Sequence, residues 1–400
     1  MVVSLLLASP SSADQVTCGS VPEPAYPAAR AIASSIEAHF LRHREAATAA
    51  GRIDLAPPPD AASVETIVDA AFWASLRREE GITPKISLAF TPPSPSSSPL
   101  LFSQPLPLYA AALAKLAPAV ERPGIHLGVW PENGSLRVWG TTRTLPALCF
   151  VLEVVASGLL VIKHRGDAFG KFVNVAVLEG DQIKMIDESD ATEPECPNMV
   201  QSLLGFDRVN TTRGDGQVNV LVQMAASMRA HGRGGALLVV PSASTTWTQS
   251  IVNPILYEVT PPFTAIADAL HERDTDPGSH EWQDDLRRAV DAVAGLTAVD
   301  GATVLRENYE LVAFGAKITR RLQHALVERV ALTEPIVGSA MTVVSPTQLG
   351  GTRHLSAAQF VHDQRDAVAL VASQDGRFTV FAWSPCEGMV HAHRVETLLL

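Results

Sequence analysis

Two short, largely apolar segments, residues 235–240 and 300–305, constrain the fold of this chain more than any other feature of its sequence. Apolar runs of this length are typical of strands that are buried on both faces of a sheet. Helix and strand patterns continue around them, at residues 218–231, 282–294, 311–316, 356–363, 366–372 and 378–383. Because helices and strands alternate along this part of the chain, we predict a mixed α/β domain with one mostly apolar sheet.

The N-terminal part begins with helical patterns and continues with short strands. We expect helices at residues 28–50, 63–78 and 108–119, two strands within 125–138, and further strands at 148–155, 159–164, 173–178 and 182–186. The pair Asn133-Gly134 favours a tight hairpin, whereas the proline- and serine-rich residues 92–99 favour a loop. These patterns predict an α+β module that is separate from the C-terminal domain.

The composition changes between the two parts. Residues 187–217 are first acidic and then rich in Pro, Asn, Thr and Gly, which is typical of a domain junction. We therefore expect a disordered tail at 1–25, a sensor-like module at 26–190, a linker at 191–216 and the α/β domain at 217–400. A chain of 400 residues is long enough for two or three domains.

The overall charge excludes two classes of partner. The chain has 31 basic and 42 acidic residues and a formal net charge of −11, which argues against wrapping nucleic acid or coating an anionic membrane. Its longest later apolar stretch, 147–162, is interrupted by Glu153 and is too short to span a bilayer.

The four cysteines share no short spacing, so neither a zinc cluster nor a dense disulfide framework is indicated. We expect a cytoplasmic protein in a reducing compartment.

Two motifs carry polar groups suited to ligand chemistry, and the first is Asp300-Gly301-Ala302. It lies at the start of the second apolar strand. A glycine there lets a ligand approach the backbone closely, and an aspartate can accept a hydroxyl or bind a metal ion. The alternative interpretation is an ordinary Asp-Gly turn before a strand, so this motif alone does not define a site.

The second motif is the segment 350–354, Gly-Gly-Thr-Arg-His, which directly precedes a predicted helix. Free amides, the Thr352 hydroxyl, the Arg353 guanidinium and the His354 imidazole converge there on the positive end of a helix dipole. This composition and position predict an anion site. The alternative is a glycine-rich loop with a Thr or Ser cap and with Arg353 and His354 in solvent.

Together, and in this order, the two motifs resemble the signatures of the diadenylate cyclase family, Asp-Gly-Ala followed further along the chain by Gly-Thr-Arg-His-Arg. The order of predicted elements over residues 217–384 is similar to that of the family. The N-terminal module resembles DACNV, a sensor domain that is found fused ahead of such cyclase domains. The resemblance implies an enzyme that condenses two ATP molecules into cyclic di-AMP and pyrophosphate, with Mg²⁺ or Mn²⁺ as cofactor.

The resemblance also implies roles for individual residues. The expected catalytic residues are Asp300, Arg353 and His354. Nucleotide contacts are expected from Asp300, Gly301, Ala302, Gly351, Thr352, Arg353 and His354. The expected metal ligands are Asp300 and Asp363. We expect ATP or a related nucleotide as the partner. Because a two-fold product needs two half-sites that face each other, we expect at least a homodimer as the active form.

Two positions depart from the family pattern. Leu355 occupies the place of the second arginine of the motif, which removes a phosphate-facing cation. The metal-binding glutamate of the family would fall at His362 or, with a one-residue shift, at Asp363, and the aspartate is the better ligand. These departures leave an alternative of another class, in which a degenerate cyclase-like domain binds a nucleotide as a sensor or signalling module and performs no chemistry.

Overall fold

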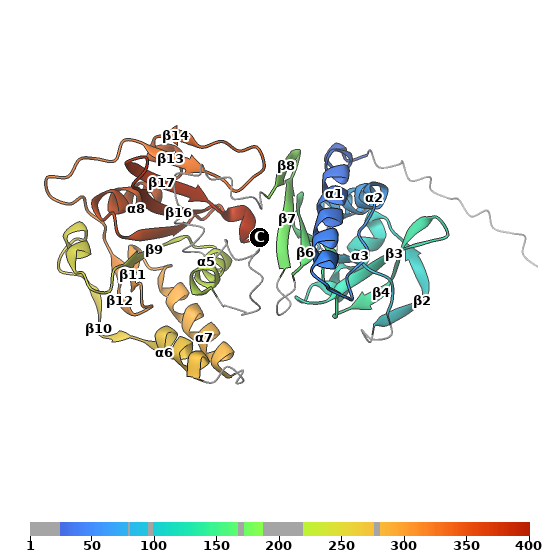
Figure 1. The fold of residues 1–400 in the computed structure, drawn as a ribbon, viewed down its shortest axis with the longest axis horizontal. Helices are drawn as coiled ribbons and strands as arrows, with labels where there is room; N and C mark the ends of the chain where they lie inside the picture. The colour runs from blue at the N-terminus through green and yellow to red at the C-terminus, as the bar shows by residue number, and fades with distance from the viewer. Residues whose placement is uncertain (1–24, 79–80, 95–98, 167–171, 187–218, 276–280) are drawn as a thin grey trace, which may run out of the picture.

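A computed structural model describes residues 25–78, 81–94, 99–166, 172–186, 219–275 and 281–400. These residues form two mixed sheets, one of eight strands in the N-terminal part and one of nine strands in the C-terminal part, each covered by helices (Figure 1). The predicted α/β fold class, with a separate N-terminal module, is thereby confirmed.

Three helices cover one face of the N-terminal sheet: α1 (Pro27–Ala49), α2 (Ala61–Ser75) and α3 (Ala110–Val120). The strand order is β2-β4-β3-β1-β5-β6-β7-β8. The strands are β1 (Ile86–Phe90), β2 (Leu100–Pro107), β3 (His126–Glu132), β4 (Ser135–Thr142), β5 (Phe150–Ala156), β6 (Leu159–Arg165), β7 (Phe172–Glu179) and β8 (Gln182–Met185). Ile32, Ile36 and Phe40, spaced four residues apart on α1, are buried in the core beneath it, which is the pattern that predicted this helix.

Local sequence signals account for the ends of several N-terminal elements. Asn133 and Gly134 have φ angles of 51° and 76°, as a tight turn between the antiparallel strands β3 and β4 requires, and the predicted hairpin is confirmed. Helix α2 begins earlier than predicted because Asp60 caps it. The Asp60 side chain accepts a hydrogen bond of 2.7 Å from the backbone amide of Ser63.

The C-terminal sheet has the strand order β10-β12-β11-β9-β15-β16-β17-β13-β14. Its strands are β9 (Gly235–Val240), β10 (Tyr257–Phe263), β11 (Ala302–Arg306), β12 (Leu311–Ala316), β13 (Val330–Thr333), β14 (Thr342–Val344), β15 (Val368–Ala372), β16 (Phe378–Ser384) and β17 (Met389–Arg394). Helices α5 (Val220–Ala230), α6 (Ala265–Thr275) and α7 (Glu281–Leu296) pack on one face, and α8 (Thr352–Asp363) packs on the other. Short 3-10 turns are η3 (Thr246–Ser250), η4 (Pro346–Gln348) and η5 (Glu396–Leu398).

Strand β9 lies in the middle of this sheet and is buried on both faces. Leu237 faces the core beneath α5, α6 and α7, whereas Leu238 faces the core beneath α8. Neither face of the strand can therefore carry a polar side chain without burying it. The uninterrupted apolar sequence of residues 235–240 is the consequence, and the predicted two-sided burial is confirmed.

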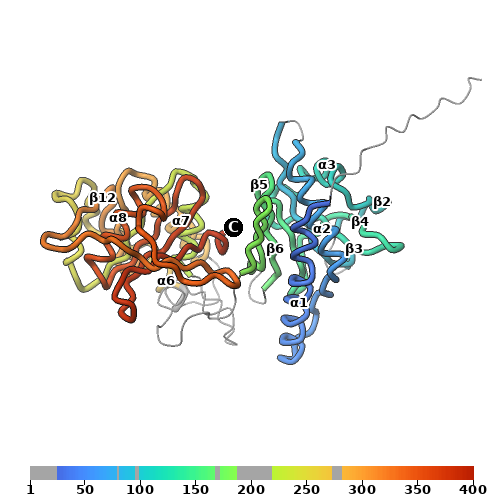
Figure 2. Tube along the Cα trace, turned by 90° about the horizontal axis from the view of Figure 1, so that it is seen from above, coloured from blue at the N-terminus to red at the C-terminus, as the bar shows by residue number. Residues whose placement is uncertain are grey.

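The two modules contact each other through β7, β8 and the C-terminal residues of the chain. Ile186, which follows β8, forms an isolated antiparallel bridge with Ile336. Lys184 forms an ion pair of 3.1 Å with Glu334. Figure 2, like Figure 1, places the C-terminus of the chain between the two modules. The edge of the N-terminal sheet is thus attached to the C-terminal module at several points.

Several elements were not predicted from the sequence, namely β1, β2, β10, α6, β13, β14 and β17. Apart from Ala25, the expected tail at 1–25 lies outside the described residues, as does the expected linker at 191–216. Helix α8 begins at Thr352, four residues before the predicted start. This shift places the Thr-Arg-His part of the second motif in the first turn of the helix.

Two further observations bear on the expected compartment. No helix among the described residues is both long enough and apolar enough to cross a membrane. In the described part of the chain, Cys149 is a buried free thiol and Cys386 is disulfide-bonded. Disulfides are rare in a reducing compartment, so this bond does not agree with that expectation, and a cytoplasmic location stays a prediction.

Candidate functional site

The two predicted motifs meet at one edge of the C-terminal sheet. Ala302 at the start of β11 lies opposite Ala236 of the parallel strand β9. Gly235 of β9 lies opposite Ala372, the last residue of the antiparallel strand β15. The amino ends of β9 and β11 and the carboxyl end of β15 therefore share this edge. Asp300, which directly precedes β11, lies there as well.

Arg353 reaches the same edge from the first turn of α8. A Cβ atom on Gly234 would lie 3.0 Å from Nη1 of Arg353 and 3.1 Å from the carbonyl oxygen of Ala372. Gly234 has a φ of 68°, so this close approach and the backbone conformation both favour glycine. The fold thus brings the guanidinium of one motif to the strand ends that carry the other.

Asp300 is an exposed carboxylate held by a lysine. Its side chain is 91% exposed and forms an ion pair with Nζ of Lys317, which follows β12. The hydrogen bond from Lys317 and the charge of Lys317 lower the pKa of Asp300, and the more distant charge of Arg353 acts in the same direction. The carboxylate is therefore ionised at neutral pH and accessible to a cation or a ribose hydroxyl.

The structure explains the presence of the glycine and the alanine of the first motif without a ligand. Gly301 has a φ of 121°, and a Cβ atom there would lie 2.4 Å from the backbone carbon of Gly315 in β12. The close approach that was expected for a ligand is therefore made by a neighbouring strand. Ala302 is buried in the core beneath α8, so its side chain points away from the sheet edge.

A small cavity lies at the start of α8. It has a volume of about 160 Å³ and is lined by Gly351, Thr352, Arg353, His354, Ala372, Ser373 and Gln374. Gly351 is the N-cap residue, and the first backbone amides of a helix have no partner within the helix. Pockets for whole ligands measure roughly 300–1,000 Å³, so this cavity suits a group of the size of one phosphate. The helix dipole and the half-buried Arg353 both favour an anion there.

His354 is turned toward the interior. Nε2 of its imidazole lies 3.4 Å from Oγ1 of Thr379, and a Cβ atom on Gly350 would lie 2.5 Å from its Nδ1 atom. Burial lowers the pKa of His354 to about 4. A neutral imidazole can form a hydrogen bond with a ligand, but it adds no positive charge, so the charge expected of this motif comes from Arg353.

Asp363 lies at the other end of α8. It follows Thr352 by eleven positions along the helix, which corresponds to about 16 Å. Its buried carboxylate accepts hydrogen bonds of 2.8 Å from the backbone amide of Arg321 and 3.0 Å from Nε2 of Gln359. The carboxylate therefore fixes the segment before β13 to α8. The structure does not bring Asp363 to Asp300, and it offers no support for a metal ion held by both.

The structure adds residues to this site that the sequence analysis missed. Lys317 is the partner of Asp300, and Ser373 and Gln374 line the cavity. Lys317 directly follows the strand predicted at 311–316, which pairs with the strand after Asp300. A search for charged residues at the ends of adjacent predicted strands would have identified it.

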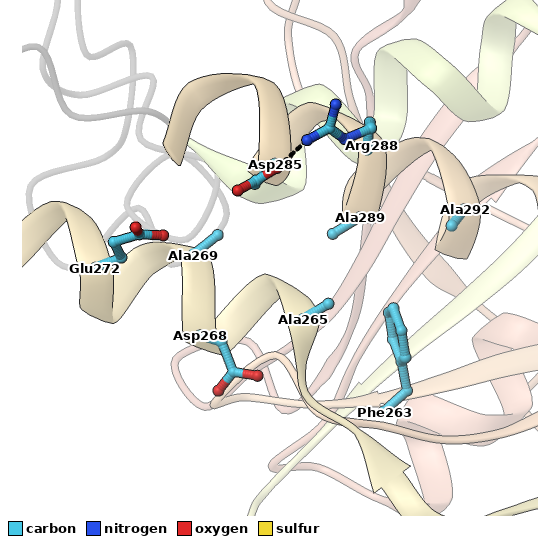
Figure 3. Close-up of a pocket in the computed structure, with 9 residues that line it drawn as sticks. All are labelled: Phe263, Ala265, Asp268, Ala269, Glu272, Asp285, Arg288, Ala289 and Ala292. Atoms are coloured by element: carbon cyan, nitrogen blue, oxygen red, sulfur yellow. Dashed lines mark hydrogen bonds and ion pairs between the residues drawn. The ribbon is translucent and has the colours of Figure 1, made fainter. Parts of the chain in front are cut away.

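A second cavity, of about 440 Å³, lies between α6 and α7 and has a different character (Figure 3). It is lined by Phe263, Ala265, Asp268, Ala269, Glu272, Asp285, Arg288, Ala289 and Ala292. The one guanidinium in this lining, Arg288, is already paired with Asp285, so the net charge of the lining is negative. A phosphate group is repelled by such a lining. Although this cavity is larger, the cavity at α8 is the better candidate for an anion.

The N-terminal module matches a known protein family over part of its length. Residues 53–143 match the family described as "Probable sensor domain DACNV". The matched segment contains α2, β1, β2, α3, β3 and β4, and it confirms the expected DACNV domain over these residues. No curated protein matches the chain. The similarity of the C-terminal part to diadenylate cyclases stays a prediction.

Proposed function

We propose that this chain is a nucleotidyltransferase that condenses two ATP molecules into cyclic di-AMP under the control of its DACNV sensor domain. The observation that carries the proposal is the meeting of Asp300 and Arg353 at one sheet edge, beside a phosphate-sized cavity at a helix N-terminus. A DACNV domain in the same chain supports it, since that domain is a sensor module associated with such cyclases.

The reaction joins two nucleotides in two equivalent steps. In each step the 3′-oxygen of one ATP forms a bond to the α-phosphorus of the other. The bond between that phosphorus and the oxygen bridging to the β-phosphate breaks, pyrophosphate leaves, and the hydroxyl proton passes to water. Charge accumulates on the phosphate oxygens during this attack, so groups that bind negative charge at the α8 N-terminus accelerate it.

At the sheet edge, different residues bind the phosphates and contact the ribose or the cation. Arg353 and the first amides of α8 bind phosphate oxygens, and the Thr352 hydroxyl can donate a further hydrogen bond. His354 fixes the start of the helix from the inside. Asp300 contacts a ribose hydroxyl or the divalent cation that accompanies ATP.

The chemistry of Asp300 fits Mg²⁺ or Mn²⁺. These hard cations prefer oxygen ligands, and Mg²⁺ is usually bound by one or two carboxylates together with substrate phosphates. Asp300 supplies one exposed, ionised carboxylate, which Lys317 neutralises when no other cation is present. The metal ion would supply charge neutralisation at the phosphates. Asp363 is not needed in this arrangement.

The small size of the cavity supports a dimer as the active form. A volume of about 160 Å³ accommodates one phosphate group, so most of each nucleotide must lie outside it. A second copy of the chain that faces this edge would enclose the remaining parts of both nucleotides and align the two half-sites.

One observation favours a second function of a different class. Leu355, at the place where the cyclase motif has its second arginine, is 39% exposed in the first turn of α8. The site therefore has one cation fewer at the phosphates. A domain that binds a nucleotide and passes its state to the sensor, without chemistry, would tolerate this loss.

A single experiment separates the two functions. The full-length protein is incubated with ATP and Mg²⁺ or Mn²⁺, and the products are analysed by mass spectrometry alongside a calorimetric binding measurement. Cyclic di-AMP together with pyrophosphate supports the cyclase. Nucleotide binding without product supports the binding module, and the absence of both would overturn the assignment of this edge as a nucleotide site.

A further inference from the structure

Three histidines from two elements of the N-terminal module lie together outside the segment that matches DACNV. His39 and His43 are one turn apart on α1, and His164 lies near the end of β6, beside that helix. The ring centroids are 4.3 Å apart for His39 and His43, 5.7 Å for His39 and His164, and 5.4 Å for His43 and His164. One nitrogen of each ring lies within 4.8 Å of the corresponding nitrogens of the other two rings.

This geometry is close to that of a metal site. Four-coordinate zinc binds histidine nitrogens at 2.0–2.1 Å, so its nitrogen ligands lie about 3.4 Å apart. The present separations, all within 4.8 Å, exceed that distance by at most about 1.4 Å. The spacing of four residues on α1 places the first two imidazoles on one helix face, and the strand beneath supplies the third.

The surroundings hold the rings in place. His39 and His164 are buried, and the ring of Phe40 packs edge-on against both of them. Nδ1 of His164 lies 3.3 Å from the carbonyl oxygen of Arg165, to which it can donate a hydrogen bond. In metal sites such a bond to a backbone carbonyl fixes the imidazole and leaves the other ring nitrogen to bind the ion.

The chemistry of the ligands selects the class of ion. Three imidazoles with no carboxylate among them suit zinc and related transition metals, whereas Mg²⁺, Ca²⁺ and Mn²⁺ prefer oxygen ligands. This preference is the opposite of that of Asp300 in the other module. The two sites can therefore be distinguished by metal alone.

We propose that the three-histidine cluster, His39, His43 and His164, binds one zinc ion through the three imidazoles and leaves one coordination position open. Three protein ligands with an open position are typical of exchangeable or reactive zinc sites, whereas structural sites have four protein ligands. His43 is only half-buried, so the open position lies toward the more accessible side of the cluster. The N-terminal module would then take a transition metal as a ligand. This proposal does not depend on the cyclase activity.

The test measures zinc binding by the full-length protein in the absence of nucleotide. The protein is stripped with a chelator, dialysed and titrated with Zn²⁺ in competition with a chromogenic chelator. The bound metal is then counted by elemental analysis. We expect one ion per chain, unaffected by a large excess of Mg²⁺. His43→Ala should weaken binding at least tenfold, since two imidazoles hold zinc much less well than three.

Two further variants serve as controls. His271→Ala removes an exposed histidine on α6 in the other module and should bind zinc like the wild type. Should His43→Ala unfold, as judged by circular dichroism, His43→Gln preserves the size of the side chain and takes its place. A wild-type protein that binds no zinc at micromolar concentration would overturn the proposal. Equal affinity in the folded His43 variant and in the wild type would overturn it as well.

Discussion

The side-chain amide of Asn174 donates a hydrogen bond of 2.8 Å to the backbone carbonyl oxygen of Thr397, although 223 positions separate the two residues. The same nitrogen lies 3.3 Å from the carbonyl oxygen of Leu400. Asn174 belongs to β7, whose neighbour in the sheet is β6 with His164. In this pairing His164 lies opposite Val173, the residue before Asn174, so the three-histidine cluster and the contact with Thr397 involve neighbouring strands.

The contact between Asn174 and Thr397 gives the first prediction. Asn174 is buried, so Asn174→Ala leaves the carbonyl oxygen of Thr397 without this donor, at a cost of about 1–2 kcal/mol. We expect faster hydrogen exchange in residues 172–178 and 395–399, with no change in the hairpin at 130–138. Asn308→Ala, which alters an exposed turn residue, is the matched control. Unaltered exchange at both segments would show that this contact does not hold the modules together.

A second prediction concerns the carboxylate at the sheet edge. Asp300→Asn keeps the size of the side chain and removes its charge, and we expect metal-dependent formation of cyclic di-AMP to be lost. The melting temperature should stay close to that of the wild type, because the side chain is exposed. Asp284→Asn, at an exposed position on α7, is the control and should retain activity. Equal product formation by the Asp300 and Asp284 variants would remove Asp300 from the site.

A third prediction concerns the guanidinium on α8. If Arg353 makes a charge-assisted bond to a phosphate, Arg353→Ala should weaken nucleotide binding by about 1.5–3 kcal/mol, or about 10- to 150-fold. Calorimetric titration with ATP measures this difference directly. Arg288→Ala removes an arginine from the negatively charged cavity between α6 and α7 and should leave the affinity unchanged. The same affinity in all three proteins would mean that Arg353 only faces solvent.

A fourth prediction follows from the burial of His354. Its pKa is about 4 in the folded state, against about 6.5 for an ordinary histidine in the unfolded chain. Between these values only the unfolded state takes up the proton, so the free energy of unfolding decreases as the pH falls from 6.5 to 4. The His354→Gln variant should lack this pH-dependent change in the free energy of unfolding, which is about 2–3 kcal/mol.

Urea denaturation at pH 7.5 and at pH 5 measures this component as the difference between the wild type and the His354 variant. His126, whose pKa burial also lowers to about 4, is present in both proteins, so its contribution cancels. The wild type should lose more stability than the variant between the two pH values. Identical losses would mean that His354 is accessible to water and takes up a proton in the folded state.

The strands that the sequence predicted, and those that it did not, differ in how local their signals are. The hairpin at Asn133-Gly134 and the two-sided burial of β9 can both be predicted from residues that follow one another in the sequence. In contrast, β1 (Ile86–Phe90) is a short, mostly apolar run between prolines. Only its pairing with two distant strands, β3 on one side and β5 on the other, makes it a central strand. Strand β2 contains two prolines, which an edge strand tolerates, and it lies at the edge of its sheet.

The candidate sites show the same limit. Sequence reasoning identified Asp300 and Arg353 from their motifs. The helix predicted at 356–363 already ended at Asp363, but the sequence could not show how far this end lies from Asp300. The glycine that caps the helix, Gly351, was assigned to a loop. The i, i+4 spacing of His39 and His43 is visible in the sequence, whereas the third histidine comes from a strand that only the fold brings to α1.

The last prediction uses the place where the motif departs from the cyclase pattern. Leu355 is 39% exposed and lies three residues after Thr352, so the two side chains are neighbours on one face of α8. An arginine at this position stays in water and buries no unpaired charge, and Leu355→Arg should therefore be as stable as the wild type. It adds a cation beside the phosphate-sized cavity at the positive end of the helix, so nucleotide affinity and, for an active cyclase, turnover should rise several-fold.

Leu355→Gln is the matched control, because it removes the apolar side chain without adding charge. Melting temperatures, ATP affinity and cyclic di-AMP formation are measured for the wild type and both variants. A gain in product with the arginine alone supports a cyclase that is weakened at this position. A gain in binding without product supports the binding module, since the added charge then stabilises only the bound nucleotide and does not accelerate a reaction. A stable arginine variant with no gain in either quantity would contradict the placement of the first turn of α8 at the phosphates.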